Sequence, residues 1–254
     1  DGAFDLIVVD ECHHYHPGAG SYWQVERCRW EATTPLLGLS GTPKWGKWWH
    51  CDLRVGDGDD MVADLEDKKV LAKPIGRAHI THLELQFDTS VEPSRMGIEV
   101  EMKNAFLKVK RADLNKHVLT ALAGFIEAST VELPVQRILV FVGSIPQSEA
   151  LVAEQGWPGG VNVKLIHSKL APEVQLANIT WFRAPRSGPE DRRVLVNVEM
   201  FVEGVDVPGI DTVFFVRPTA SETYRSQMIG RGLRGEDSGG TSHCLLVDFT
   251  YSFV

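Results

Sequence analysis

Two neighbouring carboxylates, Asp10 and Glu11, directly follow the short apolar run Leu6–Val9. An uncharged run rich in β-branched residues predicts a strand buried on both faces of a parallel sheet. Open α/β sheets bind their ligands at the carboxyl ends of such strands. There, one acid can hold the water shell of Mg²⁺, and the next can orient and deprotonate an attacking water. A solvent-facing acidic turn would have the same composition, so this pair by itself leaves both interpretations open.

Two arginines, Arg231 and Arg234, stand among three glycines between positions 230 and 235. On a helix predicted over 221–233, residues three apart project from the same side. Each glycine costs about 1 kcal/mol relative to alanine inside a helix, so a cluster of them makes sense where another group approaches the backbone closely. Arginines in such a place suit the charge of a triphosphate in its transition state. The alternative is a helix end with two surface arginines.

A zinc site formed by the residues at 12–16 is not favoured. Cys12, His13, His14 and His16 are ligands by type, but adjacent residues of an extended chain point to opposite faces and cannot readily converge on one zinc ion. The four cysteines contain no C-x-x-C pair, so neither a zinc ribbon nor a disulfide framework is indicated, and a reducing, cytoplasmic location fits best.

The segment Gly41–Lys47 matches G-x-x-x-x-G-K, the first part of the phosphate-binding P-loop pattern. We reject it as a P-loop for two reasons. It continues with Trp48 where a P-loop has the serine or threonine that ligates Mg²⁺. Pro43 also removes one backbone N–H that such a loop would donate. The neighbouring tryptophans at 45, 48 and 49 could stack on bases, although packing against another element or a partner is the favoured interpretation.

The elements that must position these groups alternate regularly after residue 137, and strands separated by single helices predict a doubly wound parallel sheet. Strands are predicted at 138–142, 161–166, 194–198, 210–216 and 243–248, with helices at 148–155, 172–182 and 221–233 between them. Earlier in the chain we expect strands at 6–9, 35–43 and 77–87 and helices at 21–30, 61–71 and 99–129. The segment 183–193 is expected to be a polar, mobile loop.

The composition is that of an ordinary globular protein, with 254 residues, 43% hydrophobic and 24% charged. The net charge of −8 lacks the basic footprint of a nucleic-acid binder, although a local basic groove remains compatible with it. No apolar run approaches the ~20 residues of a membrane span, so no membrane partner is expected. The chain opens almost on a buried strand and has no initiator methionine, so we expect a fragment of a longer protein.

Taken together and in order, these stretches resemble the motifs of a superfamily 2 DExD/H-box helicase. The sequences of motifs V and VI are most similar to the branch of restriction-enzyme motor subunits. The resemblance runs from motif II to motif VI. The matching segments are 10–13 (motif II), 40–42 (III), 138–147 (IV), 166–168, 194–208 (V) and 227–234 (VI). Motif VI matches the pattern Gln-x-x-Gly-Arg-x-x-Arg, and Val198 replaces a threonine that many relatives carry in motif V.

The resemblance implies two cofactors, ATP and Mg²⁺. Asp10 would hold Mg²⁺ through water, and Glu11 would act as the general base. His13 and Gln227 would lie near the γ-phosphate, and Arg231 and Arg234 would be arginine fingers. The other implied ATP-binding residues are Gly204, Asp206 and Gly230.

The resemblance also implies residues that connect ATP hydrolysis to nucleic acid. Ser40 and Thr42 would couple hydrolysis to movement. Ser144, His167 and Asn197 would lie near the nucleic-acid backbone. DNA is the expected partner, with RNA left open, and a nuclease or another subunit is a further possible partner.

We therefore predict an α/β fold of tandem RecA-like domains, the first truncated at its amino terminus. Residues 1–74 would be the end of the first domain, and 75–254 the second, with a helical insertion near 99–129. The predicted function is an ATP-dependent DNA helicase. Because no P-loop stands before motif II, this polypeptide is expected to be inactive alone. The alternatives are a double-strand DNA translocase subunit of a restriction or defence complex and a non-hydrolysing RecA-like scaffold.

Overall fold

A computed structural model describes residues 7–9, 36–38, 61–86, 95–200, 207–219 and 221–253 of the chain. It divides into two compact units, Asp1–Gly58 and Asp59–Val254. The domain boundary predicted after residue 74 stays a prediction.

The described part of the first unit consists of two short strands, β1 (Ile7–Val9) and β2 (Leu36–Gly38), which pair in parallel with Ile7 opposite Leu36. Both strands were predicted. Val9 is buried, with 6% of its surface exposed, whereas Val8 is 51% exposed. The prediction that β1 is buried on both faces is therefore wrong, because consecutive side chains point to opposite faces, and that of Val9 is covered whereas that of Val8 is exposed. The helix predicted at 21–30 lies outside the described residues.

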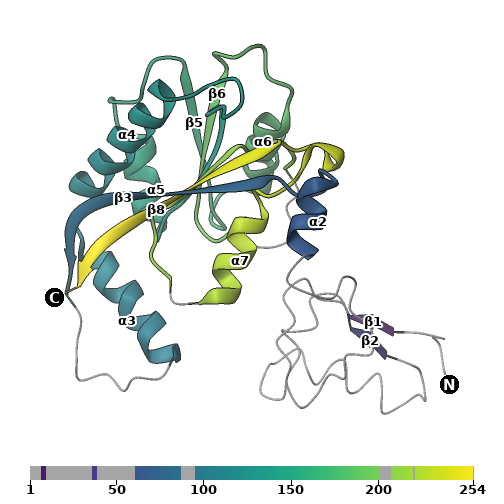
Figure 1. Ribbon diagram of the computed structural model, residues 1–254. Helices are drawn as coiled ribbons and strands as arrows, with labels where there is room; N and C mark the ends of the chain where they lie inside the picture. Colours follow the sequence, from purple (N-terminus) through teal and green to yellow (C-terminus); the bar gives the residue numbers. More distant parts are fainter. Residues whose placement is uncertain are drawn as a thin grey trace. The chain divides into compact units, whose positions relative to one another are not determined.

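The second unit is built on a six-stranded sheet in which every described pairing is parallel, in the order β3-β8-β7-β4-β6-β5. The long strands β3 and β8 run side by side along its edge (Figure 1). The strands are β3 (Lys73–Leu85), β4 (Arg137–Phe141), β5 (Val161–Ile166), β6 (Arg192–Asn197), β7 (Thr212–Phe215) and β8 (His243–Phe253). A parallel sheet needs a crossover between consecutive strands, and a single α-helix supplies it between β4 and β5, between β5 and β6, and between β7 and β8.

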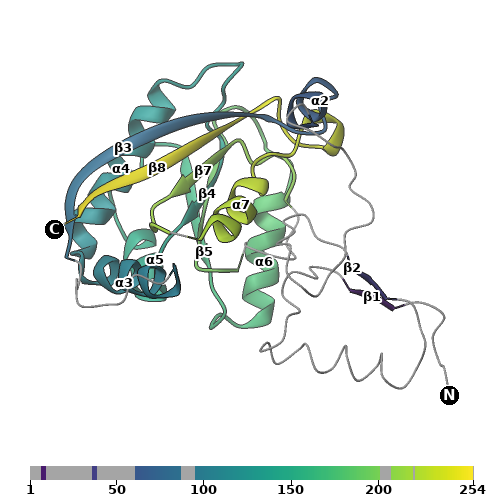
Figure 2. The same cartoon turned by 60° about the horizontal axis from the view of Figure 1, so that its bottom comes forward.

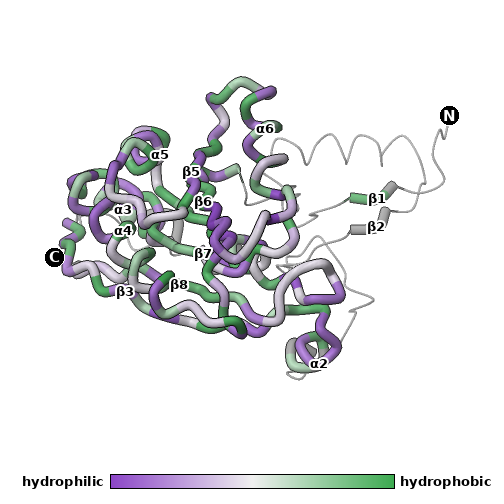
Figure 3. The backbone as a smooth tube through the Cα atoms, turned by 90° about the horizontal axis from the view of Figure 1, so that it is seen from above, coloured by the Kyte–Doolittle hydropathy of each residue, from purple (hydrophilic) through white to green (hydrophobic). Residues whose placement is uncertain are grey.

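Helices cover both faces of this sheet (Figure 2). One face packs against α3 (Arg95–Lys108), α4 (Arg111–Glu127) and α5 (Ile145–Val152), and the other against α6 (Pro172–Arg183) and α7 (Glu222–Gly230). Strand β4 contributes to the hydrophobic core on each face. Ile138 and Val140 pack on the side of α3, α4 and α5, and Leu139 and Phe141 pack on the side of α6 and α7. Its last four residues are all hydrophobic and buried, as expected of a strand with both faces covered. Figure 3 shows hydrophobic residues along much of β8, another strand of this sheet. The predicted α/β, RecA-like fold is confirmed.

The helix predicted at 99–129 is in fact two helices, α3 and α4, with a break between Lys108 and Arg111. Lys110 takes an extended conformation, φ −63° and ψ 121°, which interrupts the helical path. Hydrophobic periodicity continues across the break, so the pattern alone did not reveal it. A further short helix, α2 (Met61–Asp67), precedes β3.

The loop after α6, predicted to be mobile, is anchored by a buried arginine. The Arg193 guanidinium donates to the carbonyl oxygens of Trp181 at 2.6 Å and Ala184 at 2.8 Å, and it pairs with the Asp191 carboxylate. The hydrogen bond from Arg193 lowers the pKa of Asp191 to about 2. These contacts fix both ends of the loop, because a fork of five N–H donors can satisfy several acceptors at once.

No helix in the described part of the chain combines the length and the apolar character that crossing a bilayer requires.

Candidate functional site

Polar side chains gather where the strands of the second unit end. The register aligns Phe141 of β4 with Asn197 of β6 and with Phe215 of β7, and it aligns Asn197 with Ile166 of β5. His167 directly follows β5, and Ser144 lies three residues after the end of β4. The structure therefore brings Ser144, His167 and Asn197, three residues predicted from the motifs, to one edge of the sheet, the edge at which parallel α/β sheets bind ligands.

Ser144 is the N-cap of α5, where its hydroxyl accepts a hydrogen bond from the N–H of Gln147 at 3.3 Å. Gln147 is 3% exposed, and its Oε1 accepts from the N–H of Gly143 at 3.0 Å. Its Nε2 is buried without a hydrogen-bond partner in the described structure. Sequence reasoning assigned no role to Gln147, although the spacing Ser-x-x-Gln is the signature of a capping box.

His167 is 3% exposed and keeps one ring nitrogen without a partner. Its Nδ1 accepts from the backbone N–H of Lys169 at 3.2 Å, which leaves the proton on Nε2. Nε2 is buried and has no hydrogen-bond partner among the described residues. A buried donor of this kind is costly unless a ligand or water satisfies it.

Asn197 is fully buried and organises the turn after β6. Its Oδ1 accepts from the N–H of Met200 at 3.0 Å, and its carbonyl oxygen accepts from Val142 of the neighbouring strand end at 3.1 Å. Glu199, within this turn, has a φ of +61°, which a non-glycine residue adopts only at some cost. The side chain therefore has a structural role in addition to the contact predicted for it.

The helix α7 begins at the carboxyl edge and carries Gln227. Ser221 caps it by accepting from the N–H of Tyr224 at 3.3 Å, and the helix ends at Gly230 with Arg231 as its C-cap. Arg234 lies beyond the helix and forms an isolated antiparallel bridge with Leu71. The prediction that both arginines project from one helix is therefore wrong, since the chain leaves the helix between them.

The three glycines between 230 and 235 have different surroundings in the fold. A Cβ on Gly232 would meet Cys244 Sγ at 2.4 Å and Val213 Cγ2 at 2.8 Å, so the strands themselves occupy that space. A Cβ on Gly235 would lie 2.0 Å from the carbonyl oxygen of Lys69. Only at Gly230 would a Cβ meet nothing within 4 Å, and this glycine is exposed. A group outside the fold can thus approach the backbone only at Gly230 of the three.

The predicted residues form two sets at opposite ends of α7. Gly232 contacts Val213 and Cys244, which lie near the amino-terminal ends of β7 and β8. Arg231 therefore lies toward the amino-terminal edge, whereas Ser144, His167 and Asn197 lie at the carboxyl edge. A helix of nine residues separates the two ends by about 13 Å at 1.5 Å per residue.

Sequence reasoning missed an ion-pair cluster beside the start of α7. Arg217 is 7% exposed and donates to the carboxylates of Glu199 at 2.9 Å and Glu99 at 3.3 Å. Its guanidinium also lies over the ring of Tyr224 at 5.0 Å. Charged residues are rarely buried unless they are paired. Glu99 and Arg217 are far apart in sequence, so no local sequence pattern predicts their contact.

The amino-terminal edge of the sheet holds a buried carboxylate, Asp211. It accepts hydrogen bonds from the N–H groups of Gln136 at 3.0 Å and Arg137 at 2.8 Å and from the Thr212 hydroxyl at 2.9 Å. Burial raises the pKa of Asp211 to about 6, against the opposing effect of these hydrogen bonds and of Arg186. Because it joins the starts of β4 and β7, we assign it a structural role.

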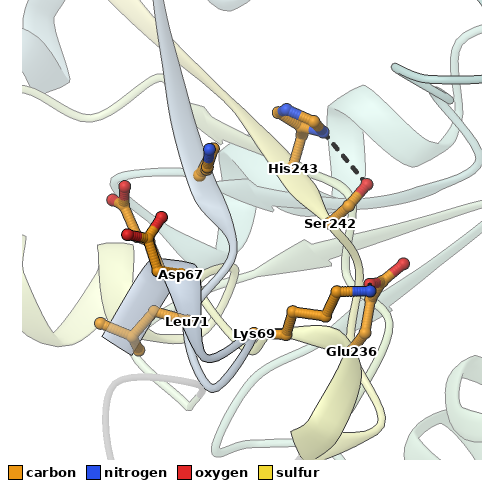
Figure 4. Close-up of a pocket in the computed structure, with 8 residues that line it drawn as sticks. Asp67, Lys69, Leu71, Glu236, Ser242 and His243 are labelled. Atoms are coloured by element: carbon orange, nitrogen blue, oxygen red, sulfur yellow. Dashed lines mark hydrogen bonds and ion pairs between the residues drawn. The ribbon is translucent and has the colours of Figure 1, made fainter. Parts of the chain in front are cut away.

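A pocket of about 410 Å³ opens at the same edge, where β3 and β8 begin. Figure 4 shows Lys69 reaching toward Glu236, with an Nζ to Oε2 distance of 2.9 Å, and His243 bonded to the Ser242 hydroxyl. The hydrogen bond to Glu236 raises the pKa of Lys69. None of the predicted site residues lines this pocket, and its charges are already paired in part, so it is not assigned to the site.

Seven predicted site residues lie outside the described residues: Asp10, Glu11, His13, Ser40, Thr42, Gly204 and Asp206. Within the described ranges, no group of three or more His, Cys, Asp or Glu side chains could hold a metal ion.

Residues 119–236 match the family described as the helicase conserved C-terminal domain. The chain is 26% identical over 238 residues, 91% of its length, to a protein named "Probable helicase A859L" of African swine fever virus. That match covers 24% of the viral protein, and the chain spans about a quarter or less of the curated relatives it matches.

Two solved structures show the same fold. One is the ATP-dependent Type ISP restriction-modification enzyme LlaBIII bound to DNA, with a TM-score of 0.62, 14% identity and coverage of 98% of this chain and 18% of that one. The other is Saccharomyces cerevisiae Dbp5 bound to RNA and ADP BeF3, with a TM-score of 0.53, 14% identity and coverage of 98% and 54%. The predicted resemblance to superfamily 2 helicases is confirmed.

Proposed function

We propose that this chain is the arginine-bearing half of an ATP-driven nucleic-acid motor, in the form of a DNA helicase, since its residues 119–236 match the family described as the helicase conserved C-terminal domain. One observation carries the proposal: a single helix, α7, connects a polar sheet edge to the two arginines of the Gln-x-x-Gly-Arg-x-x-Arg motif. Such a helix can transmit a change at one end to the other, because it moves as a rigid element.

Arg231 and Arg234 would neutralise charge on the transferred phosphoryl group, and the open approach to Gly230 supports a phosphate near the end of α7. ATP would supply the phosphoanhydride, with Mg²⁺ held by Asp10 and water oriented by Glu11. Gly204 and Asp206 would contact the nucleotide, His13 and Gln227 would lie near its γ-phosphate, and Ser40 and Thr42 would couple hydrolysis to movement.

The carboxyl edge would take the nucleic-acid backbone. The unpartnered Nε2 of His167 supplies a buried donor that a phosphate oxygen could satisfy. The hydroxyl of Ser144 would add a neutral polar group, and the buried Asn197 would contribute by holding the turn after β6. Neutral groups of this kind suit a chain whose net charge is −8. DNA is the proposed substrate, and the protein would act in the cytoplasm, alone or with a nuclease subunit.

The test is the ATPase rate of the full-length protein that carries this chain, with and without single-stranded DNA or RNA. Replacement of Arg231 by alanine is expected to lower nucleic-acid-stimulated kcat by about 10³, the lower range for an arginine finger. Arg111→Ala, the same change at the exposed start of α4, serves as the control and should stay within about twofold of wild type. Equal turnover in the two variants would refute the proposed mechanism. Strand-displacement and triplex-displacement assays then separate unwinding from double-strand translocation.

A further inference from the structure

Helix α3 contacts several loops of the carboxyl edge at once. Near its carboxyl end, Phe106 is 2% exposed, and its ring is so close to Gly143 that a Cβ there would lie 2.5 Å from the ring. Gly143 directly precedes Ser144, the cap of α5. The helix therefore fixes the loop after β4 by an apolar contact that leaves no room for a side chain at Gly143.

Near its amino end, α3 fixes the start of α7 by polar contacts. The Glu99 carboxylate accepts from the Thr219 hydroxyl at 2.9 Å and from the backbone N–H of Ser221, the N-cap of α7, at 3.2 Å. A carboxylate at this place also stabilises the positive end of the helix dipole. The same carboxylate receives the Arg217 guanidinium at 3.3 Å.

Arg217 extends the connection to the strand that bears Asn197. Its second nitrogen donates to Glu199 at 2.9 Å, two residues after Asn197, and Lys103 of α3 lies 3.7 Å from the same carboxylate. With a side chain that is 8% exposed, Arg217 holds two acids in one geometry. The side chain of Glu99 is 25% exposed, so the pair is screened less than a surface ion pair.

We propose that Glu99 is a positioning residue, which locks the nucleic-acid end of α7 so that Arg231 at its other end reaches the phosphate only when the carboxyl edge is ordered. The inference rests on the proposed function and adds to it the element that couples the two sites. In this proposal Glu99 itself would contact neither ATP nor nucleic acid. It acts through Ser221 and Arg217, at the opposite end of α7 from the arginine.

The experiment compares Glu99→Gln with Glu127→Gln, the same change at the exposed end of α4, in the full-length protein. ATPase rates are measured against ATP and against single-stranded DNA. Glu99→Gln is expected to lower nucleic-acid-stimulated kcat about tenfold, to leave KM for ATP within twofold, and to leave the unstimulated rate unchanged. Amide exchange over residues 224–230 is expected to accelerate in Glu99→Gln and not in Glu127→Gln.

A second variant, Thr219→Val, removes one donor to Glu99 and keeps the ion pair with Arg217, and it should give a smaller loss in the same direction. It keeps the test decisive if Glu99→Gln folds poorly. Stimulated turnover like that of wild type in both variants overturns the positioning role and leaves the proposed function standing. A wild-type protein without ATP turnover overturns the proposed function and the positioning role together.

Discussion

The bridge between Leu71 and Arg234 offers the sharpest test of how the arginine segment is held. Gly235 has φ −77° and ψ 174°, a conformation open to any residue, so backbone strain does not require glycine there. The requirement is steric, because a Cβ would lie 2.0 Å from the Lys69 carbonyl oxygen and 2.7 Å from the Val70 carbonyl carbon. Gly235→Ala must therefore push the segment before β3 away.

Three backbone hydrogen bonds depend on that segment. They run from Gly235 N–H to Val70 at 2.9 Å, from Asp237 N–H to Lys69 at 3.1 Å, and from Ala72 N–H to Leu233 at 3.2 Å. At about 1 kcal/mol net for each bond, their loss would cost about 3 kcal/mol. For a unit of this size, that corresponds to a fall in Tm of about 6–12 °C.

Differential scanning fluorimetry and urea titration measure this loss, and amide exchange at Ala72 and Asp237 locates it. Gly230→Ala is the matched control. It faces open space at the end of α7, so it should be neutral or stabilise the fold by up to about 1 kcal/mol. A Gly235→Ala protein with the Tm and exchange rates of wild type would refute the steric account of the bridge.

Three further outcomes are expected. Asp211, 1% exposed with a pKa raised to about 6, contributes stability that is fully present below pH 3.8 and is lost as pH rises through about 6. The unfolding free energy of wild type relative to Asp211→Asn should therefore fall between pH 4 and pH 7, by at most about 3 kcal/mol at 1.36 kcal/mol per pKa unit, and a flat difference would contradict it. His79 and His117, whose ring nitrogens lie 3.3 Å apart, have pKa values lowered mainly by burial. Their contribution has the opposite sign, being present above pH 6.5 and lost as pH falls through their lowered pKa values, and His117→Phe should remove part of that acid sensitivity in pH-dependent urea titrations. Arg193→Met should cost about 3 kcal/mol or more in such titrations, because it leaves buried carbonyl groups and Asp191 without their donor. Arg225→Met, at a pair with Asp248 whose side chains are 41% and 35% exposed, should cost less than about 1 kcal/mol, and equal losses would refute the distinction by burial.

The parallel sheet of the second unit was predictable from sequence because its signals are local. The runs at 138–142, 161–166 and 194–198 are apolar and bounded by polar residues, and each corresponds to a strand within two residues at either end. The same locality allowed the motif residues Ser144, His167 and Asn197 to be chosen before the register aligned them. Strand ends in a parallel sheet meet at one edge whatever the intervening loops do.

Tertiary structure decided what depends on contacts between distant segments. The glycines at 232 and 235 are required by Cys244 and by the Lys69 carbonyl, and no residue near them in sequence indicates either neighbour. The pair of Glu99 and Arg217 joins α3 to the segment before α7 across 118 positions. A sequence reports the type and spacing of its residues, but which distant backbone excludes a methyl group, or which acid meets a buried arginine, depends on the packed geometry alone.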